Sequence, residues 1–282
     1  MTGVKFFGFA LGSFLVTWFI LPSIKEMLVE AGFVRPNFRK ESIPLGVGLV
    51  FYLSALVVIA AGAIGGLVYK DAYSFLFAVG GMGLFGLIDD VFGTRGASGL
   101  KGHFKKLFIQ REITTGALKA LAGGVIALVV SLGNAGGGGF ERWLLVVMNT
   151  LIMALATNAV NLLDLRPGRA GKGFMLISVF IIAAGFGKAP LWYLATMAGS
   201  LAAFLPLDLK AHAMMGDTGS NMLGMTLGYT AVFVLDLPER IGFLVFLVGF
   251  HLLTEKYSLT RIIEGNKVLN YIDMIGRDKK VE

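Results

Sequence analysis

The sequence contains no cysteine and few charged residues. The lack of cysteine excludes disulfide bonds and thiolate metal sites. Charged residues make up only 15% of the chain, whereas a typical soluble domain has roughly 25%. In their place, 56% of the residues are hydrophobic, and the mean hydropathy is +0.76. This composition excludes an ordinary soluble domain and indicates a chain that is embedded in a membrane.

Long runs with little or no charge recur along the whole chain. A transmembrane helix needs roughly 20 apolar residues, with about 17 tolerated. Most of the runs have this length, and the two short ones, 173–187 and 241–254, are counted because the topology requires them. We therefore predict an all-α, polytopic membrane protein of about nine transmembrane helices. The runs are 6–24, 43–69, 72–88, 113–132, 143–163, 173–187, 189–207, 218–235 and 241–254.

The basic residues are distributed unevenly over the connections between these runs. Of the 25 lysines and arginines, nineteen lie in the C-terminal tail and the connections after the odd-numbered runs, and five lie on the other side. Because cytoplasmic loops are enriched in basic residues, we predict an N-terminus outside, a C-terminus in the cytoplasm and a location in the plasma membrane. The same asymmetry explains the pI of about 9.6, so the sequence does not predict nucleic-acid binding.

Four aspartates lie at the borders of the apolar runs, all on the predicted cytoplasmic side. Asp89 and Asp90 are adjacent, Asp164 follows the fifth run, and Asp217 lies in a turn of small residues. Carboxylates at such positions are costly and usually functional, and two adjacent ones repel each other unless a cation relieves them. Magnesium prefers oxygen ligands, often one or two carboxylates together with phosphates and waters. The four acids therefore predict a metal–phosphate site.

A basic loop follows the adjacent aspartates. It contains Lys101 and Lys105, on the same predicted side of the membrane as the acids. Lysines match the charge of a diphosphate, and carboxylates match the charge of a divalent cation. Acids and lysines on one face of the membrane together predict phosphoryl-transfer chemistry that depends on Mg²⁺.

The motifs that contain these residues resemble those of the polyprenyl-phosphate N-acetylhexosamine-1-phosphate transferase superfamily. The resemblance extends from Arg35 to about Gly224, with the motifs in the family's order and at its spacing. Each motif alone is weakly specific, but the complete set is highly specific. The matching segments are 35–38, 43–48, 88–90, 99–100 with Lys105, 158–164 and 215–220.

The resemblance implies a membrane transferase that moves a sugar-1-phosphate from a UDP-N-acetylhexosamine to polyprenyl (undecaprenyl) phosphate and releases UMP. This reaction is the first membrane step of cell-envelope glycan synthesis. The resemblance also implies Mg²⁺ as the cofactor, an active site on the cytoplasmic face and a homodimer. Carried over to this chain, the catalytic residues are Asp89, Asp90, Asp164 and Asp217, and the metal ligands are Asp217 and Asp90. The residues expected to bind substrate are Asn158, Asn161, Lys101, Lys105, Arg166 and Arg169.

Two departures from the family pattern affect this prediction. Pro167 stands where the family commonly has a second acid after Asp164, and it is flanked by Arg166 and Arg169. We expect the two arginines to grip the phosphates or an acidic group of the sugar donor; the alternative is that they anchor the loop to anionic lipid. The family's histidine-rich last cytoplasmic loop is reduced to His251. A second function therefore stays open, that of a non-catalytic or degenerate paralogue that binds polyprenyl phosphate.

The C-terminal segment 259–282 has a different pattern from the preceding membrane domain, 1–258. Its apolar residues recur at steps of three and four, with charged residues between them. This pattern predicts an amphipathic helix. Such a helix either lies on the inner leaflet of the membrane or covers the protein's own cytoplasmic face.

Overall fold

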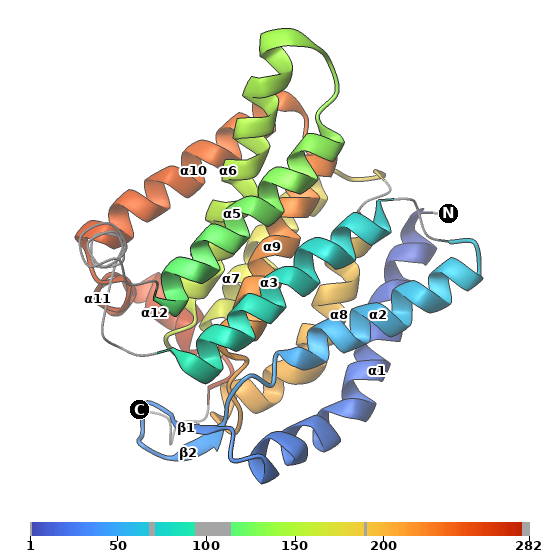
Figure 1. Ribbon diagram of the computed structural model, residues 1–282. Coiled ribbons are helices and arrows are strands. Elements are labelled where there is room, and N and C mark those ends of the chain that lie inside the picture. The colour runs from blue at the N-terminus through green and yellow to red at the C-terminus, as the bar shows by residue number, and fades with distance from the viewer. Residues whose placement is uncertain (1, 68–70, 94–113, 189–190, 278–282) are drawn as a thin grey trace.

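The computed structural model describes residues 2–67, 71–93, 114–188 and 191–277, and this part of the chain is almost entirely helical (Figure 1). Six of the described helices, α1, α3, α5, α6, α8 and α10, are long and apolar enough to cross a membrane. The predicted all-α, multi-pass class is therefore confirmed. The elements are α1 Thr2–Glu30, β1 Val34–Pro36, β2 Ser42–Pro44, α2 Leu49–Ile64, α3 Ala72–Phe92, α5 Thr115–Asn134, α6 Gly139–Leu163, α7 Arg169–Ala184, α8 Leu191–Leu209, α9 Gly216–Val234, α10 Leu237–Lys256, α11 Leu259–Gly265 and α12 Lys267–Met274.

Each predicted apolar run overlaps one long helix, but the second run begins too early. Residue Ile43 lies in β2, and α2 begins only at Leu49. The intervening Pro44 cannot donate a helical hydrogen bond, and Gly46 has a φ of +75°, so neither continues a helix. The helix that follows is apolar but shorter than the six membrane-capable ones. The number of nine spans therefore stays a prediction.

Helix α9 lies at the centre of the bundle, where it packs against α2, α3, α6, α7 and α8 (Figure 1). Nearly all of its residues are buried, although many of them are small or polar. Glycine permits the close contact with α6, because a Cβ atom at Gly224 would lie 2.5 Å from the Cα atom of Thr157. Since α9 is surrounded by other helices, it needs no apolar surface facing lipid.

The strands β1 and β2 form an antiparallel hairpin at the end of the bundle where α9 begins (Figure 1). Backbone hydrogen bonds attach this hairpin to the segment before α9: Met214 N donates to Pro44 O at 2.9 Å, and Val47 N donates to Met214 O at 3.1 Å. The first connection of the chain is thereby fixed beside Met215, which precedes α9. This contact is backbone pairing between two segments that are distant in the sequence.

Candidate active site

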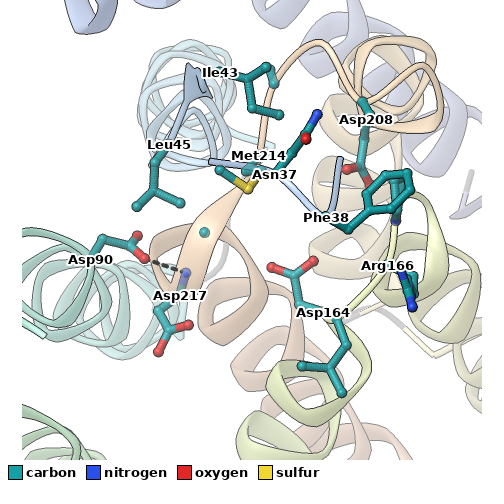
Figure 2. A pocket seen from close by; sticks show the side chains of 15 residues that line it. Asn37, Phe38, Ile43, Leu45, Asp90, Asp164, Arg166, Asp208, Met214 and Asp217 are labelled. Carbon is teal, nitrogen blue, oxygen red and sulfur yellow. Dashed lines mark hydrogen bonds between the residues drawn. The ribbon is translucent and has the colours of Figure 1, made fainter. Parts of the chain in front are cut away.

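A pocket of about 170 Å³ opens between the hairpin, the C-terminal end of α3, the loop after α6 and the segment that joins α8 to α9. Figure 2 shows the carboxylates of Asp90 and Asp164 on opposite sides of the hollow, with Phe38 and Arg166 close together on the Asp164 side. The pocket therefore combines motifs that are far apart in the sequence. Its lining residues are Asn37, Phe38, Ile43, Leu45, Asp90, Asp164, Leu165, Arg166, Pro167, Asp208, Ala211, Ala213, Met214, Gly216 and Asp217.

Asp90 connects the end of α3 to the beginning of α9. One of its carboxylate oxygens accepts a hydrogen bond from Asp217 N at 2.9 Å, and the other accepts from Thr218 N at 2.9 Å and Thr218 Oγ1 at 2.6 Å. A carboxylate at this position satisfies free amide groups of the first turn and matches the positive end of the helix dipole. Gly216 allows the approach: its φ is +70°, and a Cβ atom there would lie 2.4 Å from Asp90 Oδ2.

Lys119 of α5 lies between two of the predicted catalytic acids. Its Nζ atom is 2.8 Å from Asp89 Oδ2, and it also donates a hydrogen bond to Asp217 Oδ2. The side chains of Lys119 and Asp89 are only 13% and 17% exposed, so the charges compensate each other out of contact with most of the solvent. Sequence analysis missed Lys119 as a site residue. Its isolation as a lone cation in an uncharged run was the available signal.

Asn161 of α6 completes this cluster. With its amide nitrogen facing Asp217, the side chain donates to Asp217 Oδ1 at 3.0 Å and accepts from Lys119 Nζ at 3.2 Å. Ser220 Oγ lies 3.0 Å from the same amide. The structure therefore brings together Asp89, Asp217 and Asn161, three residues that the sequence predicted for the site.

Two acids lie on the other side of the pocket. Burial, reinforced by the negative charges of Asp208, Asp217 and Asp90, raises the pKa of Asp164 well above its ordinary value. Asp208, which sequence analysis did not predict, accepts a hydrogen bond from Gly168 N at 2.9 Å. It holds the loop between α6 and α7 against α8. The pocket thus gathers acids whose ionised forms a bound cation would favour.

The two arginines of the predicted donor loop have different surroundings. Arg166 lines the pocket, and its guanidinium carbon lies 5.2 Å from the centre of the Phe38 ring. The guanidinium of Arg39 lies 5.4 Å from the same ring. By contrast, Arg169 is buried and forms an ion pair with Asp273 of α12, at 2.8 Å. Arg169 is therefore already paired with a protein group, whereas Arg166 lines the pocket. Contact of either arginine with the donor stays a prediction.

Asn158, another predicted substrate-binding residue, is not among the residues that line the pocket. Asn158 is exposed, and its amide nitrogen lies 3.0 Å from His251 Nε2 of α10. His251 Nδ1 lies 2.8 Å from Leu247 O, so the histidine links α6 to α10 at this end of the bundle. Lys101 and Lys105 lie outside the described residues.

The carboxylates suit a divalent cation that is completed by substrate. Within the described ranges, no group of three or more His, Cys, Asp or Glu side chains is arranged as a metal site. Asp89 and Asp217, however, already share one positive charge, that of Lys119. Magnesium commonly takes only one or two carboxylates and fills its shell with phosphate oxygens and waters. This pair therefore fits the predicted cofactor, while Asp90 is occupied by the amides of α9.

Residues 72–235 match the model of the glycosyl transferase family 4. Three relatives are phospho-N-acetylmuramoyl-pentapeptide-transferases. The protein of Clostridium kluyveri is 26% identical over 268 residues, covering 86% of this chain and 80% of the relative. That of Lactobacillus delbrueckii subsp. bulgaricus is 31% identical over 211 residues, covering 70% and 63%. That of Caldicellulosiruptor bescii is 27% identical over 295 residues, covering 95% and 88%.

Proposed function

We propose a reaction for this chain on the premise that it belongs to the glycosyl transferase family 4, within the polyprenyl-phosphate N-acetylhexosamine-1-phosphate transferase superfamily. The chain transfers a sugar-1-phosphate from a UDP-N-acetylhexosamine to polyprenyl phosphate and releases UMP, as the first membrane step of cell-envelope glycan synthesis. The observation that carries the proposal is the cluster of Asp89, Lys119, Asn161 and Asp217 beside the pocket. The names of the relatives, phospho-N-acetylmuramoyl-pentapeptide-transferases, support the transfer of a phosphorylated N-acetylated sugar.

In the proposed reaction, an oxygen of the lipid phosphate attacks the β-phosphorus of the UDP-sugar. The bond between that phosphorus and the bridging oxygen breaks, and UMP leaves with this oxygen. A phosphate monoester has a second pKa of about 6, so the lipid phosphate is largely dianionic at neutral pH. It therefore needs no general base to remove a proton. The protein's contribution is to align the two phosphates and to neutralise their charge.

Asp89 and Asp217 are the residues that would hold Mg²⁺, with phosphate oxygens completing the shell. Bound there, Mg²⁺ would neutralise charge on the diphosphate of the donor. Lys119 places a second positive charge at the same acids. Asn161 orients Asp217 through a hydrogen bond, and Asp90 fixes the backbone of Asp217 by accepting from its amide. Arg166 and Phe38 line the pocket, where they would contact the donor.

The same proposal includes the placement in the membrane. Nine spans with the N-terminus outside put the ends of α3 and α6 and the start of α9 on the cytoplasmic face of the plasma membrane, where UDP-sugars are available. The distribution of basic residues supports this orientation. With this orientation the described part of the tail, 259–277, lies on the cytoplasmic side, and a homodimer is the expected assembly.

The test is a turnover assay with purified protein, undecaprenyl phosphate, Mg²⁺ and a panel of UDP-N-acetylhexosamines, with UMP as the measured product. Asp217→Asn keeps the size of the side chain but removes its charge, so turnover should fall by orders of magnitude. The matched control is Asp236→Asn, because Asp236 is exposed and lies at the other end of α9. Near wild-type turnover in the Asp217 variant would refute the metal assignment.

A second candidate function is a paralogue that binds polyprenyl phosphate without turnover. Pro167 favours it, because this residue lines the pocket where the family commonly carries an acid. The same assay separates the two functions. Lipid binding without UMP release for any donor would establish the second, and UMP release would exclude it.

A further inference from the structure

We propose that Asp273 is a positioning residue, through which helix α12 holds the pocket loop between α6 and α7 in place for the sugar donor. This inference rests on the proposed function, because the donor is the substrate that the loop would meet. The loop consists of residues 164–168, and Leu165, Arg166 and Pro167 of this loop line the pocket. No described residue of the C-terminal segment 259–282 lines the pocket.

The first step is the ion pair that joins α12 to α7. Arg169 donates to Asp273 through two nitrogens on one edge of its guanidinium, with Nε 3.0 Å from Oδ1 and Nη2 2.8 Å from Oδ2. This two-pronged geometry is specific to arginine and fixes the relative orientation of the two side chains. Arg169 and Asp273 are only 4% and 6% exposed. The pair is therefore sheltered from the screening that weakens surface ion pairs.

The second step connects Asp273 to the loop. Arg277 Nη2 lies 2.7 Å from Asp273 Oδ1, and Arg277 Nε donates to Pro167 O at 2.8 Å. On the other side of the same peptide group, Gly168 N donates to Asp208 Oδ2 at 2.9 Å. The peptide group between Pro167 and Gly168 is thus held at both its carbonyl and its amide, by Arg277 of the tail and by Asp208 of α8. If Asp273 loses its charge, Arg277 loses the group that aims it at Pro167.

The third step is the character of α12. Its buried side carries Asp273, whereas its large apolar side chains are exposed: Val268 is 66%, Tyr271 72% and Ile272 43% exposed. Hydrophobic packing therefore contributes little to holding this helix against the protein. The contact between α12 and the loop depends on ion pairs and hydrogen bonds, so a change at Asp273 releases the loop without opening a cavity in the core.

The experiment compares Asp273→Asn and Arg277→Gln with Glu264→Gln, a matched control on an exposed acid of α11. For Asp273→Asn and Arg277→Gln, we expect the KM for the UDP-sugar to rise about tenfold, a change equivalent to ~1.4 kcal/mol, with the KM for the lipid unchanged. The double variant should resemble either single variant, because both changes release the same contact. Asp273→Glu should recover part of the loss.

A readout without turnover accompanies the kinetics. The chain has no cysteine, and Leu165 is 60% exposed, so Leu165→Cys reports the mobility of the loop through its rate of maleimide labelling. Asp273→Asn should raise this rate, and Glu264→Gln should leave it unchanged. If the wild type shows no turnover, the proposed function fails while the labelling still decides whether α12 holds the loop. Unchanged labelling, or equal changes in both KM values, would overturn the inference.

Discussion

At the scale of single residues, Lys119 determines the charge balance beside the pocket. Its ammonium group is shared by Asp89 and Asp217, which come from two different helices. Without this cation, the two carboxylates would repel each other in a poorly solvated place. The lysine therefore has two effects: it links α5 to α3 and α9 through ion pairs, and it competes with Mg²⁺ for the charge of the two acids.

Lys119→Met should lower kcat by about 10²–10³-fold, the range found when one preorganised electrostatic contact to a transition state is removed. It should also lower the Mg²⁺ concentration needed for half-maximal turnover, because the competing cation is gone. A magnesium titration of the purified variant measures both effects. Lys188→Met serves as the control, since its ion pair with Asp236 is exposed and remote from the pocket. An increased Mg²⁺ requirement would contradict this account.

Gly216 is the residue whose backbone conformation the junction of Asp90 and α9 depends on. Gly216→Ala should lower both the melting temperature and turnover, because alanine at a φ of +70° costs ~1–2 kcal/mol and its Cβ atom would lie 2.4 Å from Asp90 Oδ2. Gly242→Ala is the matched control: nothing lies within 4 Å of its added Cβ atom. Thermal unfolding and UMP release measure the difference. Equal melting temperatures and equal UMP release for the two variants would show that the junction of Asp90 and α9 tolerates a methyl group at Gly216.

At the scale of elements, the tail is attached by charge, and this makes its stability depend on pH. Burial alone would raise the pKa of Asp273, but the hydrogen bonds and charges of Arg169, Arg277 and Lys172 outweigh burial and lower that pKa below its ordinary value. A lowered pKa in the folded state means that ionised Asp273 stabilises the fold. This contribution is complete above the unfolded value of about 3.9 and is lost as the pH falls through the folded value.

The wild type should therefore lose more stability than Asp273→Asn when the pH is lowered from about 5 to about 3, since only the wild type gives up this ionised contact. The melting temperatures of the two proteins, measured in detergent across that range, should converge at the acidic end. Glu264→Gln should follow the wild type throughout. Parallel curves for the wild type and Asp273→Asn would mean that Asp273 contributes no pH-dependent stability.

At the scale of the whole molecule, the residues of the candidate active site lie at one end of the bundle. The ends of α3 and α6, the start of α9 and the β1–β2 hairpin meet there (Figure 1), while the long apolar faces of α1 and α10 are exposed along their length. Exposed apolar faces on a protein of this composition are surfaces for lipid. We therefore expect the candidate active site to lie at the edge of the membrane rather than at its midplane.

The proposed orientation predicts that single cysteines on opposite ends label from opposite sides. Gly138→Cys lies in the connection before α6, in open space, and Glu264→Cys lies on exposed α11. A membrane-impermeant maleimide should label the first variant in intact cells and the second only after permeabilisation. Labelling of both from the same side would contradict the nine-span arrangement and the cytoplasmic active site.

The sequence by itself determined the membrane class, the approximate helix positions and most of the acids, because long apolar runs and rare charges are local properties of the chain. The motif spacing also predicted the family. It did not predict that Asp90 would bind the first turn of α9 or that Asp208 would hold the Gly168 amide, since both contacts join segments that are distant in the sequence.

Only the tertiary structure distinguished the roles of residues that have the same chemistry and lie close together in the sequence. Arg166 and Arg169 are three positions apart and equally basic, yet the turn at Gly168 directs Arg166 to the pocket and Arg169 to Asp273. Lys119 is a single cation in an apolar run of the sequence, and its two acidic partners follow only from the packing of α5 beside α3 and α6. The sequence specifies the charge of a side chain, but the packing of the helices decides which group that side chain contacts.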